Sequence, residues 1–187
     1  MTQEDTGTGR SAALEERLDQ VRQWEESIRP GPLTRLVRRL GRTRGFAAVY
    51  RRVGPIVDPK IAHIADGGVI AKVYGLPFLL LHTTGAKSGQ PRTSPLVFLR
   101  DGDDFLLVGT NFGQPKHPGW TANLRAHPEA ALEVGPVRLD VTALQIEDPD
   151  EWAHHWESFK AVYPGYANYL DRRGTLTPRM FRLTPHG

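Results

Sequence analysis

Six short segments after residue 77 have the apolar or alternating pattern that is typical of β-strands. They are Phe78–Thr84, Thr93–Leu99, Phe105–Thr110, Ala130–Val134, Val137–Leu144 and Met180–Leu183. Turn-forming residues connect the second segment to the third at residues 100–104, and Gly135-Pro136 connects the next pair. Short connections without a long helix between strands predict a closed or partly closed antiparallel barrel.

Three helices are expected beside this barrel. Near the N-terminus, apolar positions recur at steps of three or four, which predicts an amphipathic helix that ends before Pro30. These positions are Leu14, Leu18, Val21, Trp24 or Glu25, and Ile28. A short helix is predicted over Gly119–Ala126, and Asp148 or Asp150 is placed to cap a third helix over Glu151–Ala161. The expected fold class is therefore mainly β with flanking helices (α+β).

Charge is distributed unevenly along the chain. Residues 27–65 carry nine basic side chains against the single acidic Asp58, whereas residues 1–26 have a net charge of −4 and residues 66–187 of −1. Within the basic segment, a helical pattern surrounds an apolar stripe with arginines. The stripe is Leu33, Leu36, Val37 and Leu40, and the arginines are Arg35, Arg38, Arg39, Arg42, Arg44, Arg51 and Arg52.

Two interpretations of this basic segment stay open. Its leucines pack on the domain while its arginines face water, or residues 33–52 make peripheral contact with an anionic membrane. Nucleic acid is not expected as a partner, because no aromatic residues lie among the arginines of residues 35–44 to stack on bases.

Composition sets outer limits on the function. Of the 187 residues, 39% are hydrophobic, which is enough for a sizeable core, and none is cysteine, which excludes thiolate nucleophiles and iron–sulfur clusters. No apolar run approaches the ~20 residues of a spanning helix, and Met1–Arg10 lacks the features of a secretion signal. We expect a cytoplasmic protein, peripheral at the inner membrane face if the basic segment binds lipid. Residues 1–70 would form a basic helical extension and residues 71–187 the barrel domain.

The stretch from Thr83 to Thr93 carries the richest chemistry, and it joins the first two predicted strands. Its two glycines let backbone N–H groups approach a ligand closely, and Lys87 and Arg92 add two cations among hydroxyls. Such donors suit phosphate or carboxylate oxygens. The stretch is not a Walker loop, because Ala86 precedes the lysine and no long helix follows. A polar hairpin loop with exposed cations remains the alternative.

A second polar loop covers residues 110–118. It follows the predicted strand Phe105–Thr110, which is expected to pair with Thr93–Leu99, the strand after the first loop. Trp120 and Asn123 follow it closely. If both loops border one crevice of a small barrel, the site has an anion-binding end and a flat, aromatic-lined end. That shape suits a dinucleotide-like or flavin-like cofactor.

The sequence motifs occur in a specific order. Residues 79–96 are LLLHTTGAKSGQPRTSPL, Asp101-Gly102-Asp103 follows, and residues 111–129 are NFGQPKHPGWTANLRAHPE. In this order they resemble the deazaflavin-dependent nitroreductase family, over about residues 75–135 and again over residues 163–185. The resemblance implies a split β-barrel, like that of FMN-binding proteins, which binds coenzyme F420, an 8-hydroxy-5-deazaflavin with a phosphate and polyglutamate tail.

The resemblance also implies roles for individual residues. Lys87 and Arg92 would hold the phosphate-containing tail, the backbone of residues 110–113 would follow the ring edge, and other side chains would shape the groove. The cofactor-binding set is Thr84, Lys87, Ser88, Arg92, Pro95, Thr110, Asn111, Phe112, Gly113, Trp120 and Asn123. Two departures stand out: family members often have Ser-Lys-Gly-Gly at residues 110–113, so one cation is missing unless Lys116 replaces it, and His82 stands where a threonine is usual.

Tyr163, Tyr166 and Tyr169 recur every three residues, and the family implies that tyrosines in this region line the space for the acceptor. One of them would hydrogen-bond the acceptor oxygen as hydride arrives. Packing of these rings in the core is the alternative, because Pro164 and Gly165 leave their common facing uncertain.

Other residues that could bind ligands have simpler interpretations. His154 and His155 are adjacent and so point to different faces of a helix, which disfavours a metal site. The spacing of Trp152 and Trp156, four residues apart, favours core packing, and His117 and His127 each precede a proline, as turn residues do.

Together these features predict an oxidoreductase that transfers hydride from reduced F420 to a planar hydrophobic acceptor, such as a quinone, an enone or a nitroaromatic. The lack of cysteine is consistent with chemistry that needs no protein nucleophile. Two alternatives remain: a split-barrel reductase that uses FMN, and a non-catalytic module that binds a cofactor or lipid at a membrane surface. The chain is expected to be a monomer or a homodimer.

Overall fold

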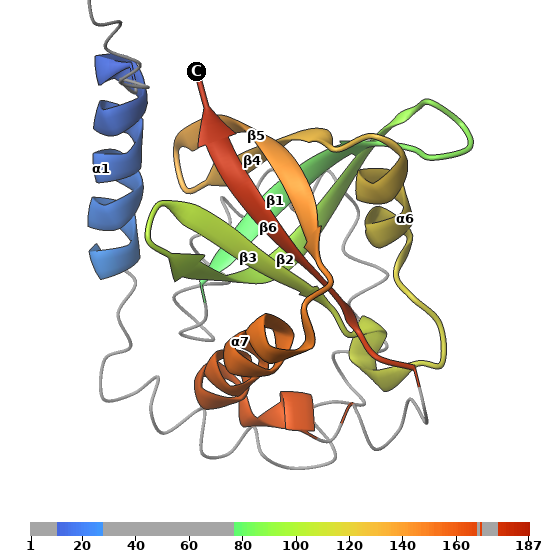
Figure 1. Ribbon diagram of the computed structural model, residues 1–187. Helices are drawn as coiled ribbons and strands as arrows, with labels where there is room; N and C mark the ends of the chain where they lie inside the picture. The colour runs from blue at the N-terminus through green and yellow to red at the C-terminus, as the bar shows by residue number, and fades with distance from the viewer. Residues whose placement is uncertain (1–10, 28–76, 168, 170–175) are drawn as a thin grey trace, which may run out of the picture.

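The computed structural model describes residues 11–27, 77–167, 169 and 176–187, in which six antiparallel strands close into a barrel (Figure 1). The strands are β1 (Phe78–Thr84), β2 (Pro91–Asp101), β3 (Asp104–Gly109), β4 (Glu129–Val134), β5 (Val137–Ile146) and β6 (Arg179–His186). Their order around the barrel is β1-β2-β3-β6-β5-β4, and β4 returns to pair with β1. The predicted closed antiparallel barrel is confirmed.

Helical segments lie around this barrel. They are α1 (Ala12–Ser27), the 3-10 turn η1 (Asn111–Gly113), α6 (Gly119–Ala126), α7 (Pro149–Val162) and the 3-10 turn η2 (Pro164–Tyr166). Asp148 is the cap of α7, since its carboxylate accepts hydrogen bonds from the N–H groups of Asp150 and Glu151 at 3.1 and 2.8 Å. That geometry decides between the two capping residues that the sequence allowed.

The strand pattern explains which side chains enter the barrel. In β5 the buried residues Val137, Leu139, Val141 and Ala143 alternate with exposed ones, as a strand with one buried face requires. The predicted five-residue connection at residues 100–104 is shorter in the structure, because β2 and β3 pair as far as Asp101 opposite Asp104. Gly102 has a φ of 60°, which suits the first position of a two-residue hairpin turn.

Two hydrophobic clusters lie on the two sides of β3. Phe105 and Leu107 face the larger cluster, which fills the barrel, whereas Leu106 and Val108 face a smaller cluster. The smaller cluster contains Trp156 and Phe159 of α7 and three aromatic rings that flank or follow it. Figure 1 shows α7 across the barrel wall near the junction of β3 and β6. Trp152 stacks on Trp156 with ring centroids 5.2 Å apart, as the core interpretation of this pair predicted.

Helix α1 contributes to the larger cluster. Leu14, Leu18 and Val21 are buried in it, so the predicted amphipathic face is confirmed. Arg22 of α1 forms an ion pair of 2.7 Å with Asp103 in the β2–β3 turn. The predicted basic helix of residues 33–52, Ile28, Pro30 and the expected domain boundary at residue 70 lie outside the described residues. Among the described helices, none is both long and apolar enough to cross a lipid bilayer.

Candidate functional site

The loop between β1 and β2 is closed by its own backbone. The N–H of Gly85 donates to the carbonyl of Gln90 at 2.9 Å, and the N–H of Gly89 donates to the carbonyl of Gly85 at 2.8 Å. Gly89 has a φ of 65°, a conformation that glycine adopts without steric cost. A Cβ on Gly85 would lie 2.6 Å from Ser88 Oγ and 3.1 Å from the Gln90 carbonyl. Both glycines are therefore needed for this compact loop.

Two cations project from this loop region. Lys87 lies in the loop and Arg92 opposite Thr83 in the β1–β2 ladder, and both side chains are exposed. Neither has an ion pair with a carboxylate within the described part of the chain. Two charges that no carboxylate of the described residues neutralises can bind an anionic group from solution.

The β1–β2 register places the remaining predicted loop residues on two faces. Directly opposite residues share a face, so Arg92 shares one with Thr83, whereas Thr84 and Pro95 belong to the alternate set. Ser88 Oγ accepts a hydrogen bond of 3.3 Å from the Gln90 N–H inside the loop. The structure thus keeps Lys87, Ser88 and Arg92 at one end of the ladder, and Pro95 lies about 10 Å along β2 from Arg92.

Asn123 of α6 holds the loop in place. Its Oδ1 accepts a hydrogen bond of 3.0 Å from the N–H of Ala86, and its Nδ2 donates to Thr83 Oγ1 at 3.0 Å. One side chain therefore forms hydrogen bonds with both the loop and the end of β1. Thr83 is buried and was not among the predicted site residues, because no sequence pattern connects positions 40 residues apart.

The segment after β3 has an unusual backbone. Asn111 and Phe112 have φ angles of 47° and 54°, in the left-handed region. The N–H of Gly113 donates to the Thr110 carbonyl and that of Gln114 to the Asn111 carbonyl, both at 3.0 Å. Asn111 Nδ2 donates to the carbonyl of Lys116 at 3.1 Å. Thr110 and Gly113 are buried, while the ring of Phe112 is 46% exposed.

Trp120 is an exception among the predicted site residues. Its side chain is only 6% exposed, and its ring lies 5.6 Å from that of Phe181 in the cluster that fills the barrel. The interior cluster therefore explains why this ring is buried. Trp120 is related to the proposed site through helix α6, which also carries Asn123, and not through an exposed face of its ring.

The three predicted tyrosines come together. The ring centroids of Tyr163 and Tyr166 are 5.3 Å apart, those of Tyr166 and Tyr169 5.8 Å, and those of Tyr163 and Tyr169 6.3 Å. Tyr166 and Tyr169 are buried, whereas Tyr163 is half-buried. A Cβ on Gly165 would contact the Tyr163 ring at 2.5 Å, so glycine permits this arrangement. The packing of these rings in the smaller core is confirmed, and their role in binding the acceptor stays a prediction.

Val108 and Met180 connect this tyrosine cluster to the segment of residues 110–113. Both belong to the smaller core cluster together with Tyr166 and Tyr169, and they face each other in the β3–β6 ladder. The next pair in that ladder is Gly109 and Arg179, directly before Thr110. The tyrosines and the strained segment therefore border the same end of β3.

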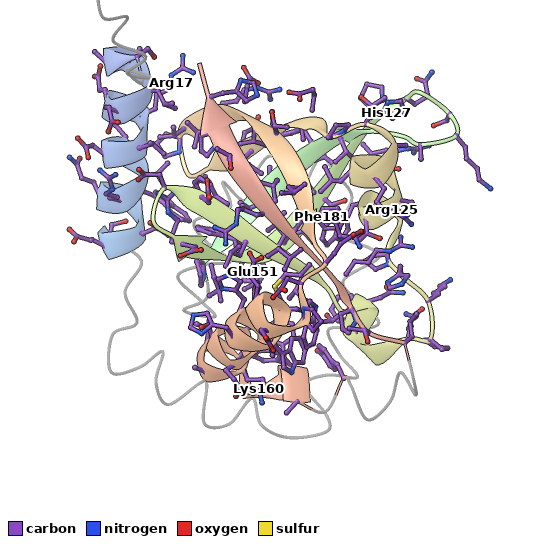
Figure 2. All side chains as sticks on the ribbon, viewed as in Figure 1. Arg17, Arg125, His127, Glu151, Lys160 and Phe181 are labelled. Carbon is purple, nitrogen blue, oxygen red and sulfur yellow. The ribbon has the colours of Figure 1, made fainter. Side chains whose placement is uncertain are left out.

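Arg179 is a further cation near this end, and no sequence motif singled it out. Its Nη1 lies 3.4 Å from Thr121 Oγ1 of α6. Burial, together with the charge of Arg125, lowers the pKa of Arg179. Figure 2 shows Arg125 on α6, on the side of the barrel away from Arg17 of α1.

His155 belongs to an ion network instead of a metal site. Arg182 contacts Asp101 at 2.7 Å, Asp104 at 3.1 Å and Glu151 at 2.9 Å, and it lies 3.3 Å from His155 Nε2. Burial lowers the pKa of Arg182, but its hydrogen bonds to these three carboxylates outweigh burial and raise it. Within the described residues, no group of three or more potential ligands is arranged to hold a metal ion.

His82, which occupies the position of a usual threonine, lies away from the loop cations. Its Nδ1 is 3.0 Å from Thr93 Oγ1, and its Nε2 is 3.2 Å from Glu133 Oε1 on the neighbouring strand β4. The described contacts of His82 therefore connect β1 to its two neighbours in the barrel wall.

The fold and this site define a class of protein: a split β-barrel with a glycine-containing loop between β1 and β2 that exposes two cations. Residues 59–180 match the family described as F420H(2)-dependent quinone reductase, and the chain belongs to that family. It is accordingly an F420H2-dependent quinone reductase, an oxidoreductase. The expected deazaflavin cofactor is confirmed. The family does not support the alternative, an enzyme that uses FMN.

Individual relatives support this assignment. An F420H(2)-dependent quinone reductase of Mycobacterium tuberculosis (strain H37Rv) is 46% identical over 105 residues, which cover 54% of this chain and 70% of that protein. A putative F420H(2)-dependent quinone reductase of Mycobacterium bovis matches to the same extent.

Two solved structures are also similar. A structure described as an F420-H2 dependent reductase has a TM-score of 0.52 and 36% identity, over 57% of this chain and 93% of that chain. A second, described as a domain-swapped dimer, has a TM-score of 0.53 and 32% identity, over 70% of this chain and 98% of that one.

Proposed function

We propose that this quinone reductase binds the anionic tail of F420H2 through Lys87 and Arg92 and holds its ring along residues 110–113. The observation that carries the proposal is a compact glycine loop with two exposed cations that have no carboxylate partner in the described part of the chain. A phosphate and a chain of carboxylates fit such donors, so the residues present suit this cofactor.

The cofactor, when bound, supplies hydride from ring carbon C5, and the chain supplies position and polarity. Asn123 fixes the loop that carries Lys87, so the tail has a defined anchor. The segment of residues 110–113 offers backbone groups to the ring edge. The buried clusters on both sides of β3 exclude water from the strand that leads to this segment.

Tyr163 is proposed to donate a hydrogen bond to the quinone oxygen where negative charge develops. It is the half-buried member of the tyrosine cluster, while Tyr166 and Tyr169 support its ring at 5.3 and 6.3 Å. A hydroxyl aimed at a developing oxyanion stabilises the transition state more than the ground state. We propose that the space beside this hydroxyl determines which acceptors bind, whether quinones alone or also enones and nitroaromatics.

Titration of the protein with oxidised F420, followed through the cofactor's fluorescence, tests the proposed anchor. Lys87→Ala and Arg92→Ala each remove a charge-assisted hydrogen bond of about 1.5–3 kcal/mol, which predicts a dissociation constant raised by about tenfold or more. Arg17→Ala on α1 is the matched control and should bind like the unaltered protein. Unchanged affinity in both loop variants would refute the anchor.

Location and assembly are proposed at a coarser level. The nine basic side chains of residues 27–65 favour contact with an anionic membrane surface, and pelleting with anionic liposomes should disappear when residues 28–65 are removed. Persistent pelleting would contradict this. The extension over residues 1–70 and the barrel over residues 71–187 remain a proposed division. The chain is proposed to be a monomer or a homodimer, and light scattering decides between them.

A further inference from the structure

The ring of Phe112 combines two properties that stability alone does not favour. It is 46% exposed, and its backbone has a φ of 54° and a ψ of 27°. A left-handed conformation is uncommon for residues other than glycine and asparagine, and for a bulky side chain it is a clear outlier. Such strain persists where surrounding structure imposes it, and it concentrates at functional sites.

Surrounding contacts do impose this conformation. The N–H groups of Gly113 and Gln114 close the turn on the carbonyls of Thr110 and Asn111, and the Asn111 side chain ties it to the Lys116 carbonyl. Asparagine tolerates the left-handed region, so Asn111 is an ordinary choice for its position, whereas the phenylalanine after it is not. The turn would form as well with glycine at residue 112.

Leu144 provides a direct contrast. Among the described residues, Leu144 and Phe112 are the two large hydrophobic side chains classed as exposed, at 70% and 46%. Leu144 occupies an outward position of β5 with a regular strand backbone, so its exposure follows from the alternation of the strand. Strand alternation does not account for the exposure of Phe112, since the residue stands in a turn with left-handed backbone angles.

The position of Phe112 relates it to the tyrosine cluster. It follows Val108 by four residues, which limits the distance between their Cα atoms to about 14 Å, and Val108 packs in one cluster with Tyr166 and Tyr169. The backbone between them is the segment proposed to follow the ring edge of the cofactor. A flat, exposed ring in this segment is available to contact a planar acceptor that stacks on the cofactor ring.

We infer that Phe112 is a specificity-determining residue, whose ring contacts the face or edge of a flat aromatic quinone. The inference rests on the proposed function and deepens it, because it names the property of the acceptor that the site selects: an extended planar ring system. Aromatic pairs gain from offset or edge-to-face contact beyond the area they bury. A two-ring naphthoquinone should therefore depend on Phe112 more than a one-ring benzoquinone does.

Four variants in the full-length protein test this inference. Phe112→Leu removes the flat ring and keeps an apolar side chain, Phe112→Gly removes the ring and relieves the backbone, and Phe112→Trp keeps a flat ring. Leu144→Ala is the control for an exposed apolar side chain away from the strained turn. KM and kcat are measured with F420H2 for a naphthoquinone and a benzoquinone. Binding of the naphthoquinone to protein loaded with oxidised cofactor, where no turnover occurs, is measured by calorimetry.

Loss of the ring in Phe112→Leu and Phe112→Gly should raise the KM and the dissociation constant of the naphthoquinone by about three- to tenfold. The KM of F420H2 should stay within twofold. Phe112→Trp should keep more of the naphthoquinone affinity than Phe112→Leu does, Leu144→Ala should stay near the unaltered protein, and the benzoquinone should change less than the naphthoquinone. Phe112→Gly should unfold at the same temperature as the unaltered protein or higher, since glycine removes the strain.

Unchanged naphthoquinone binding in Phe112→Gly would overturn the inference, whatever its melting temperature. An equal rise in the KM of F420H2 would also overturn it, because the ring would then support the cofactor and not the acceptor. If the unaltered protein reduces no quinone, the proposed function fails, and the calorimetric measurement still decides whether Phe112 binds the planar ring.

Discussion

A single carboxamide joins the proposed cofactor loop to the rest of the molecule. Asn123 accepts from the Ala86 N–H and donates to Thr83 Oγ1, both at 3.0 Å. The loop itself is exposed at Lys87, Ser88 and Gly89, so few other contacts hold it. The position of Lys87 therefore depends on a residue that does not need to touch the ligand.

Removal of this carboxamide should weaken cofactor binding although both cations remain. Asn123→Ala leaves the Ala86 N–H without its partner, which costs about 1–3 kcal/mol of stability, and lets the loop move. A double-mutant cycle with Thr83→Val should show coupling, because the two side chains share one hydrogen bond. Urea unfolding and F420 titration measure the two effects. Additive losses in the cycle would show that the Asn123–Thr83 bond contributes nothing.

His155 predicts a pH dependence of stability. Burial is the largest cause that lowers its pKa, and Arg182, whose Nη2 lies 3.3 Å from its Nε2, adds to the shift. Asp101 and Glu151 oppose it from 3.8 Å. Because the folded state favours the neutral ring, the unfolded chain takes up a proton first as the pH falls below about 6.5, and stability decreases.

The test compares unfolding free energies at about pH 7.5 and about pH 5.5. His155→Gln should lose less stability over this range than the unaltered protein, since its side chain does not titrate. His154→Gln, at an exposed neighbouring position, should keep the dependence of the unaltered protein. An identical pH dependence in His155→Gln would contradict the assignment.

At the scale of elements, the β4–β5 turn contributes to the attachment of α1. Gly135 connects β4 to β5 with a φ of 58°, and a Cβ added to it would collide with the ring of Trp24 on α1. Gly102, in the β2–β3 turn, has a φ of 60° and no atom within 4 Å of such a Cβ. The two glycines thus share the backbone requirement and differ in the contact with α1.

Gly135→Ala should destabilise the protein more than Gly102→Ala does. Both substitutions force alanine to adopt a positive φ, which lowers the free energy of unfolding by about 1–2 kcal/mol. Only Gly135→Ala displaces Trp24 as well. Chemical denaturation of the two variants measures the difference, and in a Trp24→Ala background the two glycine substitutions should cost the same. Equal losses in both glycine variants would show that the α1 contact adds no stability.

The elements themselves were largely predictable from the sequence. Each predicted strand has a counterpart in the structure. In strands such as β5, apolar and polar residues alternate in the sequence, and buried and exposed side chains alternate in the same way. The ends were less accurate: β2 and β6 extend past their apolar positions, since ladder pairs such as Arg100–Phe105 and Asp140–His186 continue with polar residues. The insertion of β6 between β3 and β5 was not predictable, because it depends on pairs far apart in the chain.

The site was predictable in part. Lys87 and Arg92 were selected from their residue types in a glycine loop; the structure shows both exposed there, and their contact with the cofactor stays a prediction. The burial of Trp120 and the bridging role of Asn123 could not be read from the sequence, since both depend on partners 37 or more residues away. The strain at Phe112 is likewise a property of the folded turn.

At the scale of the whole molecule, the proposed parts of the site are connected through one end of β3. Residues 110–113 leave that end, Val108 packs with the tyrosines, and α6 carries Asn123 to the loop of Lys87. The barrel is the frame that sets these parts relative to one another, because its six strands form a closed ladder. The central claim is that this frame holds F420 by its anionic tail at Lys87 and Arg92.

A crystal structure of the full chain with bound F420 tests that claim most directly. Phosphate or carboxylate oxygens of the tail should lie about 3 Å from Lys87 Nζ and from the Arg92 guanidinium, with the ring beside residues 110–113. A tail bound elsewhere, for example against Arg125 and Arg179, with Lys87 and Arg92 in solvent, would contradict the account.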